Sequence, residues 1–163
     1  MTPITIALVM SWSPCYAKER VTELAAGRES ISALEVCDLP IPPADRLWLL
    51  LHQEVLPEAT LRELACRFAE RALEREREAG RESDVRSWAA IAAERRWLGG
   101  ELTDNGLGDA GAAARVAARA AGAAAGAAAE AAEATTQLAL VKAMLVAARE
   151  EPVAAKGDEE DLP

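Results

Sequence analysis

The sequence is poor in the side chains that most enzymes use for chemistry at neutral pH. It has one histidine, His52, and three cysteines, Cys15, Cys37 and Cys66, none of which forms a Cys-x-x-Cys pair. A structural zinc site or a disulfide framework needs more of these residues at closer spacing. We therefore expect no metal, no cofactor and no disulfide framework, and a reducing, cytoplasmic environment.

Aromatic residues are also scarce, at 4% of the 163 residues, and no segment alternates apolar and polar side chains over the length of a strand. Alanine, leucine, glutamate and arginine dominate instead, and these residues favour helix over strand. The composition predicts an all-α, single-domain helical bundle, with short N-terminal helices and long alanine-rich C-terminal helices. We expect the helical domain to span residues 1–150 and residues 151–163 to form an acidic, disordered tail.

The formal net charge is −9, but residues 150–163 carry more than half of it, with six acidic side chains and one basic side chain. The remainder is close to neutral and has no basic patch, which predicts no binding to nucleic acid. The longest uncharged stretch of the alanine run, 120–129, is well short of the ~20 apolar residues that cross a bilayer, so we expect no membrane span. The N-terminal apolar run is short and follows no basic residue, which argues against a signal peptide.

Prolines and serines predict where the helices begin. They favour four short helices in the N-terminal third, over residues 2–10, 13–27, 30–37 and 43–52. A longer helix is expected over 57–79, because Leu61, Leu64, Ala65, Phe68 and Ala72 recur at steps of three and four.

The next helix is expected to begin after Ser83 or Asp84 and to end before Gly99 and Gly100. The side chains predicted to be buried along it are Val85, Trp88, Ile91, Ala92 and Leu98.

Residues 110–134 contain seventeen alanines, and all but one of the other residues fall on a narrow helical stripe. This pattern predicts an internal strut against which another helix can approach closely. One straight helix over 110–149 would be ~60 Å long, too long for a compact domain of this length, whose radius of gyration is near ~15 Å. We therefore expect either a break near Thr135 and Thr136 or a projecting helix that meets a partner.

The apolar side chains that follow Thr136 are spread too widely around the expected helix to pack against a single neighbouring helix. They predict a homo-oligomer whose interface contains Leu138, Val141, Met144 and Leu145.

Two catalytic or metal-binding possibilities are weak. Cys15 could be a nucleophile if it lay at a helix N-terminus near His52, although a small buried thiol and a helix-end histidine are more common. The sequence Asp104-Asn105-Gly106 resembles a calcium loop, but the twelfth position is Arg115 rather than glutamate, so a turn is expected. We therefore assign no catalytic or metal-binding residue and predict that the protein is not an enzyme.

The order of four sequence blocks resembles a known group of proteins. The blocks are 41–49 (IPPADRLWL), 64–73 (LACRFAERAL), 86–91 (RSWAAI) and 96–104 (RWLGGELTD), and the alanine run follows them. They are similar to alanine-rich, all-helical proteins of phages and bacterial mobile regions, some of which are labelled immunity proteins of polymorphic toxin systems. The resemblance covers residues 4–149 and brings no catalytic residues.

The resemblance implies a non-enzymatic protein-interaction factor, which acts as an immunity protein or as a phage accessory or counter-defence protein by binding an unidentified protein partner. The alternative is a helical protein that binds or sequesters a small ligand such as a nucleotide. For that alternative the candidate contacts are Arg95, Arg96 and Trp97, at the end of the helix that precedes Gly99.

Overall fold

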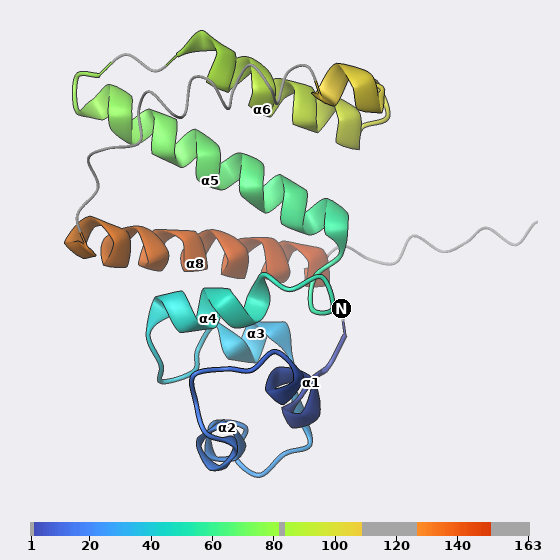
Figure 1. Cartoon of the computed structure of the whole chain (residues 1–163), viewed down its shortest axis with the longest axis vertical. Coiled ribbons are helices and arrows are strands. Elements are labelled where there is room, and N and C mark those ends of the chain that lie inside the picture. The colour runs from blue at the N-terminus through green and yellow to red at the C-terminus, as the bar shows by residue number, and fades with distance from the viewer. Residues whose placement is uncertain (1, 82–83, 109–126, 151–163) are drawn as a thin grey trace, which may run out of the picture.

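The computed structural model describes residues 2–81, 84–108 and 127–150, and these residues are mostly helical (Figure 1), which confirms the predicted all-α class. The elements in chain order are β1 (Ile4–Thr5), α1 (Ile6–Ser11), α2 (Lys18–Leu24), β2 (Ser30–Ile31), α3 (Ala33–Val36), α4 (Pro43–Leu50), α5 (Glu58–Glu78), α6 (Val85–Leu98) and α8 (Ala127–Glu150). Most of the alanine strut expected over 110–134, namely residues 110–126, and the whole of the tail expected over 151–163 lie outside the described residues.

The chain begins with a short strand rather than the expected helix over 2–10. Strand β1 pairs antiparallel with β2, which places Ile4 opposite Ile31, and both side chains are buried. Helix α1 then begins at Ile6, because the hydroxyl oxygen of Thr5 accepts a hydrogen bond from the Leu8 amide at 3.1 Å and caps the helix. The expected helix is therefore wrong in its first residues and correct from Ile6 onward.

The second expected helix, over 13–27, also begins too early. Ser13 has a φ of 54°, in the left-handed region that a helix start does not use, and α2 begins only at Lys18. The segment does end near Gly27, whose φ of 70° suits a residue without a Cβ atom. As a consequence, Cys15 lies in the loop before α2 and not in the first turn of a helix.

Helix α3 is capped by Ser32 rather than by the expected Ser30, which belongs to β2. The Ser32 hydroxyl accepts from the Glu35 amide at 3.3 Å, and the Glu35 carboxylate accepts from the Ser32 amide at 2.8 Å. This reciprocal pair is a capping box. The hydrogen bond from the Ser32 amide, helped by the neighbouring Arg28 guanidinium, lowers the pKa of Glu35 to about 2.

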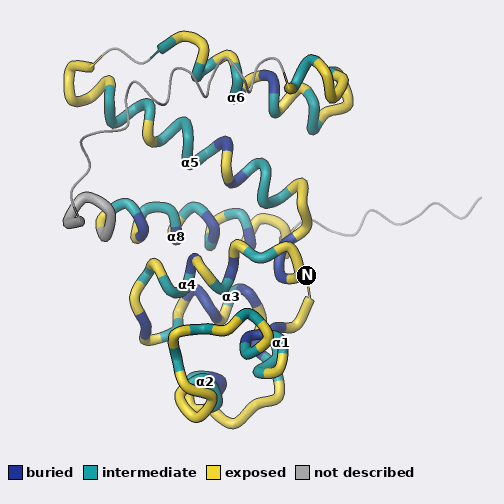
Figure 2. Tube along the Cα trace, in the orientation of Figure 1, coloured by how far each residue is buried: buried dark blue, intermediate teal, exposed yellow. Residues whose placement is uncertain are grey.

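Helix α8 continues through Thr135 and Thr136, so the expected break there is wrong. It packs against α3 and α4 and also contacts α5 (Figure 1). Three neighbouring helices therefore cover part of its apolar surface. Figure 2 shows buried residues gathered where α3, α4 and α8 meet, whereas most of α6 is exposed or half-buried.

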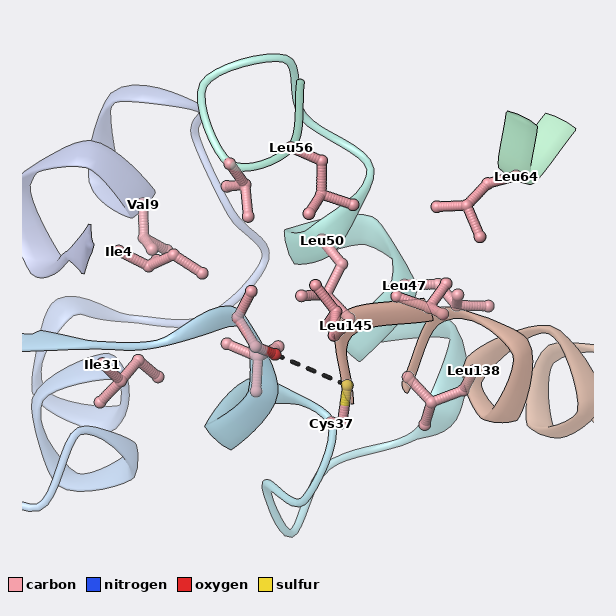
Figure 3. Close-up of a cluster of buried hydrophobic side chains, with 14 of the residues drawn as sticks. Ile4, Val9, Ile31, Cys37, Leu47, Leu50, Leu56, Leu64, Leu138 and Leu145 are labelled. Carbon is pink, nitrogen blue, oxygen red and sulfur yellow. Dashed lines mark hydrogen bonds between the residues drawn. The ribbon is translucent and has the colours of Figure 1, made fainter. Parts of the chain in front are cut away.

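The core formed there contains most of the residues that were predicted to form an oligomer interface. Leu138, Val141 and Leu145 are buried inside the chain, and the half-buried Met144 packs against the same cluster. Figure 3 shows Leu138 and Leu145 near Leu47 of α4. The interface prediction is wrong for Leu138, Val141 and Leu145, because these side chains are buried within the chain. The homo-oligomer itself stays a prediction.

Helices α5 and α6 match the expected ranges closely, and Asp84 caps α6 by accepting from the Arg86 amide at 2.8 Å. Some burial expectations along α6 are wrong: Val85 is 77% exposed, Ala92 is exposed, and Trp88 and Leu98 are half-buried.

Ion pairs tie α5 to both α6 and α8. Arg62 of α5 pairs with Glu94 of α6 at 2.8 Å, and Arg75 of α5 pairs with Glu133 of α8 at 2.6 Å.

The packing of α8 predicts a contrast between two valines in that helix. Val141 is fully buried and Val146 is 37% exposed. Val141→Ala should lower the free energy of unfolding by about 2 kcal/mol, because it removes buried methyl groups and leaves a cavity. Val146→Ala is the matched control and should cost less than about 0.5 kcal/mol, as measured by urea denaturation. Equal costs at the two positions would contradict the packing described here.

The capping box predicts a pH-dependent contribution from Glu35. Its pKa is lowered to about 2 in the folded chain, so the ionised form is favoured by folding and its stabilisation is present above pH ~4.5. Glu35→Gln should therefore lower the urea midpoint at pH 7, and the difference from the wild type should shrink as the pH falls from ~4.5 towards ~2. A difference that stays constant over this range would show that the charge of Glu35 does not contribute.

Candidate functional site

A largely apolar cavity lies between the β1–β2 pair and helices α1, α2 and α4, with a volume of about 470 Å³. These elements form the N-terminal end of the molecule in Figure 1. Most of the lining is aliphatic or aromatic and comes from segments spread over 4–49. The principal apolar residues are Ile4, Val9, Trp12, Val21, Leu24, Ile31, Leu39, Ile41, Trp48 and Leu49.

An aromatic cluster closes the space between the ends of α1 and α4. Trp12 stacks on His52 with ring centroids 3.7 Å apart and planes 3° from parallel. Trp48 meets both rings edge-on, with its centroid 6.0 Å from that of Trp12 and 5.0 Å from that of His52. Trp12 and Trp48 line the cavity. His52 thus packs against tryptophan, which is the structural role that is more common for a helix-end histidine.

The polar lining of the cavity is small and centres on one hydrogen bond. The Tyr16 hydroxyl donates to the Asp45 carboxylate at 2.5 Å and joins the loop before α2 to the first turn of α4. This hydrogen bond raises the pKa of the Tyr16 hydroxyl above its ordinary value. Tyr16 is therefore a neutral donor at physiological pH.

The cavity lining carries negative charge. Among the described residues, no lysine or arginine lines it, and Asp45 is its one carboxylate. Asp45 lies in the first turn of α4, where the aligned peptide dipoles favour a negative charge. The cavity therefore combines an apolar body with a single anionic group.

The three residues proposed for nucleotide binding do not form one site. Arg95 pairs with Glu63 at 3.1 Å and with Glu70, whereas the nearest carboxylate to Arg96 is Glu101, at 3.8 Å. The guanidinium of Arg95 is thus held by two carboxylates of α5.

Trp97 has different neighbours again. Its indole N–H donates to Asp104 at 2.7 Å, and the guanidinium of Arg62 lies 4.5 Å from the ring centroid. The surface depression at Trp97 is lined by Glu58, Glu94 and Asp104 but by one arginine, Arg62. This excess of carboxylates would repel the phosphates of a nucleotide.

The cysteines differ in their access to solvent. Cys15 is exposed and lines the cavity, whereas Cys37 and Cys66 are buried. Burial raises the pKa of the Cys37 and Cys66 thiols. Cys15 is therefore the thiol best placed to report on what enters the cavity.

The sequence did not point to this cavity as a site, because its lining comes from segments that are not adjacent along the chain. One sequence signal was present. The chain has few aromatic residues, and half of its tryptophan, tyrosine and phenylalanine residues line the cavity, namely Trp12, Tyr16 and Trp48. Their clustering in the first third of the sequence could have suggested a shared apolar site.

Two other kinds of site have no candidate within the described part of the chain. Over 2–81, 84–108 and 127–150, no three histidine, cysteine, aspartate or glutamate side chains are placed to hold a metal ion. In the same residues, no helix combines the length and apolar character needed to cross a membrane.

No protein-family model, curated protein sequence or solved structure matches this chain. The resemblance to alanine-rich proteins of phages and bacterial mobile regions therefore stays a prediction.

The different burial of the cysteines predicts selective labelling. In the native protein, an excess of a maleimide should modify Cys15 and leave Cys37 and Cys66 unmodified, because the buried thiols are out of reach and hold their protons more tightly. Mass spectrometry should show one adduct per chain under native conditions and three in denaturant. A Cys15→Ser variant that still gains an adduct rapidly would contradict the described burial.

Proposed function

We propose that this protein is a non-enzymatic binding protein that holds a small, largely apolar ligand in the cavity between the β1–β2 pair, α1, α2 and α4. The observation that supports the proposal is the cavity itself, with its volume of about 470 Å³ and mainly apolar lining. Small-molecule sites commonly have volumes of ~300–1,000 Å³ and combine apolar walls with a few polar groups. The cavity has both properties.

Contacts within the chain hold the walls of the cavity in place. The β1–β2 pair fixes Ile4 and Ile31, the Tyr16–Asp45 hydrogen bond ties the loop before α2 to α4, and the aromatic cluster ties α1 to the end of α4. A site that is ordered before binding loses less conformational entropy when a ligand enters. Apolar surface that the ligand removes from water then contributes at about 25 cal/mol per Å².

This proposal keeps the binding role expected from the sequence but changes the site. The nucleotide alternative is replaced by an apolar ligand, because the surface around Trp97 is acidic and the cavity has no basic lining residue among those described. The immunity or phage accessory role, through a protein partner, stays a prediction that depends on the resemblance of the blocks within residues 41–104.

The proposal is tested by blocking the cavity. Ala44 is exposed, lines the cavity and occupies the second position of α4 after Pro43. Ala59 is also exposed and occupies the second position of α5, away from the cavity. The neutral apolar dye N-phenyl-1-naphthylamine should bind the wild type with a rise in fluorescence. Ala44→Trp should weaken binding by about tenfold or more by filling the entrance, and the matched Ala59→Trp variant should bind as the wild type does.

A second readout uses Cys15 at the cavity. Saturating dye should slow maleimide labelling of Cys15 in the wild type and in Ala59→Trp, because a bound ligand covers a lining residue. Absence of saturable dye binding, or equal weakening by both tryptophan substitutions, would overturn the proposal.

A further inference from the structure

We infer that the ligand of this cavity is an amphiphilic amine, with an apolar body among the aliphatic and aromatic walls and a positively charged head group against the Asp45 carboxylate. The inference rests on the proposed function and deepens it by naming the chemical class of the ligand. It depends on the charge of the lining and on the hydrogen-bonding capacity of Asp45.

The Asp45 carboxylate can accept more hydrogen bonds than it receives from the described residues. The Tyr16 hydroxyl donates to one of its oxygens, Oδ2, at 2.5 Å. An ionised carboxylate has about four acceptor positions on its two oxygens. A donor group of a ligand can therefore bind Asp45 while Tyr16 keeps its own hydrogen bond.

The sign of the local charge selects a cation over an anion. Arg20 is the basic residue that acts on Tyr16, but its guanidinium is exposed and pairs with Glu23 at 3.0 Å. Asp45 thus remains the charge that a ligand meets inside the lining. Next to an apolar wall the attraction between this carboxylate and an ammonium group is stronger than in bulk water, whereas a ligand carboxylate would be repelled.

The aromatic residues add to this preference. Trp12 and Trp48 line the same cavity as Asp45, and the face of an indole ring attracts a cation. Hydrophobic burial of the ligand body and attraction of its head group then act at one site. A fatty alcohol would gain the first contribution and part of the second, and a fatty acid would gain the first alone.

The experiment compares three ligands with the same alkyl chain: decylamine, decanol and decanoate, each used to displace N-phenyl-1-naphthylamine at pH 7. At this pH the amine is protonated and the acid is ionised. We expect decylammonium to bind about tenfold more tightly than decanol, and decanol to bind more tightly than decanoate, since a hydrogen bond to a charged group commonly changes affinity by this factor or more.

Two variants separate the charge of Asp45 from its structural role. Asp45→Asn removes the charge and keeps a carbonyl acceptor for Tyr16, so it should abolish the preference for decylammonium and leave decanol affinity within about twofold of the wild type. Tyr16→Phe removes the hydrogen bond and keeps the charge, so it should retain the preference. Each ligand affinity is compared with the dye affinity of the same variant, because loosening of the loop before α2 would weaken all ligands together, whereas loss of the Asp45 charge weakens decylammonium alone.

The outcomes distinguish the two proposals. If the dye binds the cavity but the three ligands compete equally, or decanoate competes best, the inference of an amine ligand fails while the proposed function stands. If Asp45→Asn binds dye normally and keeps the full preference for decylammonium, the assignment to Asp45 is overturned. If no dye binds the wild type in a manner that Ala44→Trp weakens, the proposed function itself fails.

Discussion

The structure depends on the burial of one face of α8 against α3 and α4. Val141 of α8, Leu50 of α4 and Val36 of α3 have no measurable exposure to solvent, and each removes apolar surface from water, the main favourable contribution to folding. This contact joins residues nearly a hundred positions apart and holds α4 in place. Because α4 also supplies Asp45 and Trp48, the same contact fixes one wall of the N-terminal cavity. The site therefore depends on a core to which α8 contributes Leu138, Val141 and Leu145.

The N-terminal segment is held in place by several local contacts rather than by one long helix. The β1–β2 pair, the Thr5 cap, the capping box of α3 and the stacking of Trp12 on His52 each fix a short element. Short helices are marginal on their own, so their positions follow from these tertiary contacts. Side chains packed around short elements of different directions leave a space that long parallel helices would fill. The cavity is the result of that arrangement.

The chemical character of the cavity limits what the protein can bind. The one histidine is stacked in the aromatic cluster, two of the three thiols are buried, and the arginines at the end of α6 face carboxylates. What the described residues offer instead is an apolar space with one carboxylate and one neutral hydroxyl donor. The proposed binding of an amphiphile rests on these features.

Local sequence determined the helical class and the limits of the longer helices. Alanine, leucine, glutamate and arginine favour helix wherever they lie, and Asp84, Pro57 and Gly80 mark helix ends through contacts within a few residues. Tertiary structure decided the rest. It placed Ile4 in a strand because Ile31 lies opposite, carried α8 through Thr135 without a break, and put Leu138, Val141 and Leu145 inside the chain instead of at an interface. It also created the cavity, because lining residues as far apart in the sequence as Ile4 and Leu49 come to the same site only after the helices pack. A local sequence pattern cannot predict such a long-range arrangement.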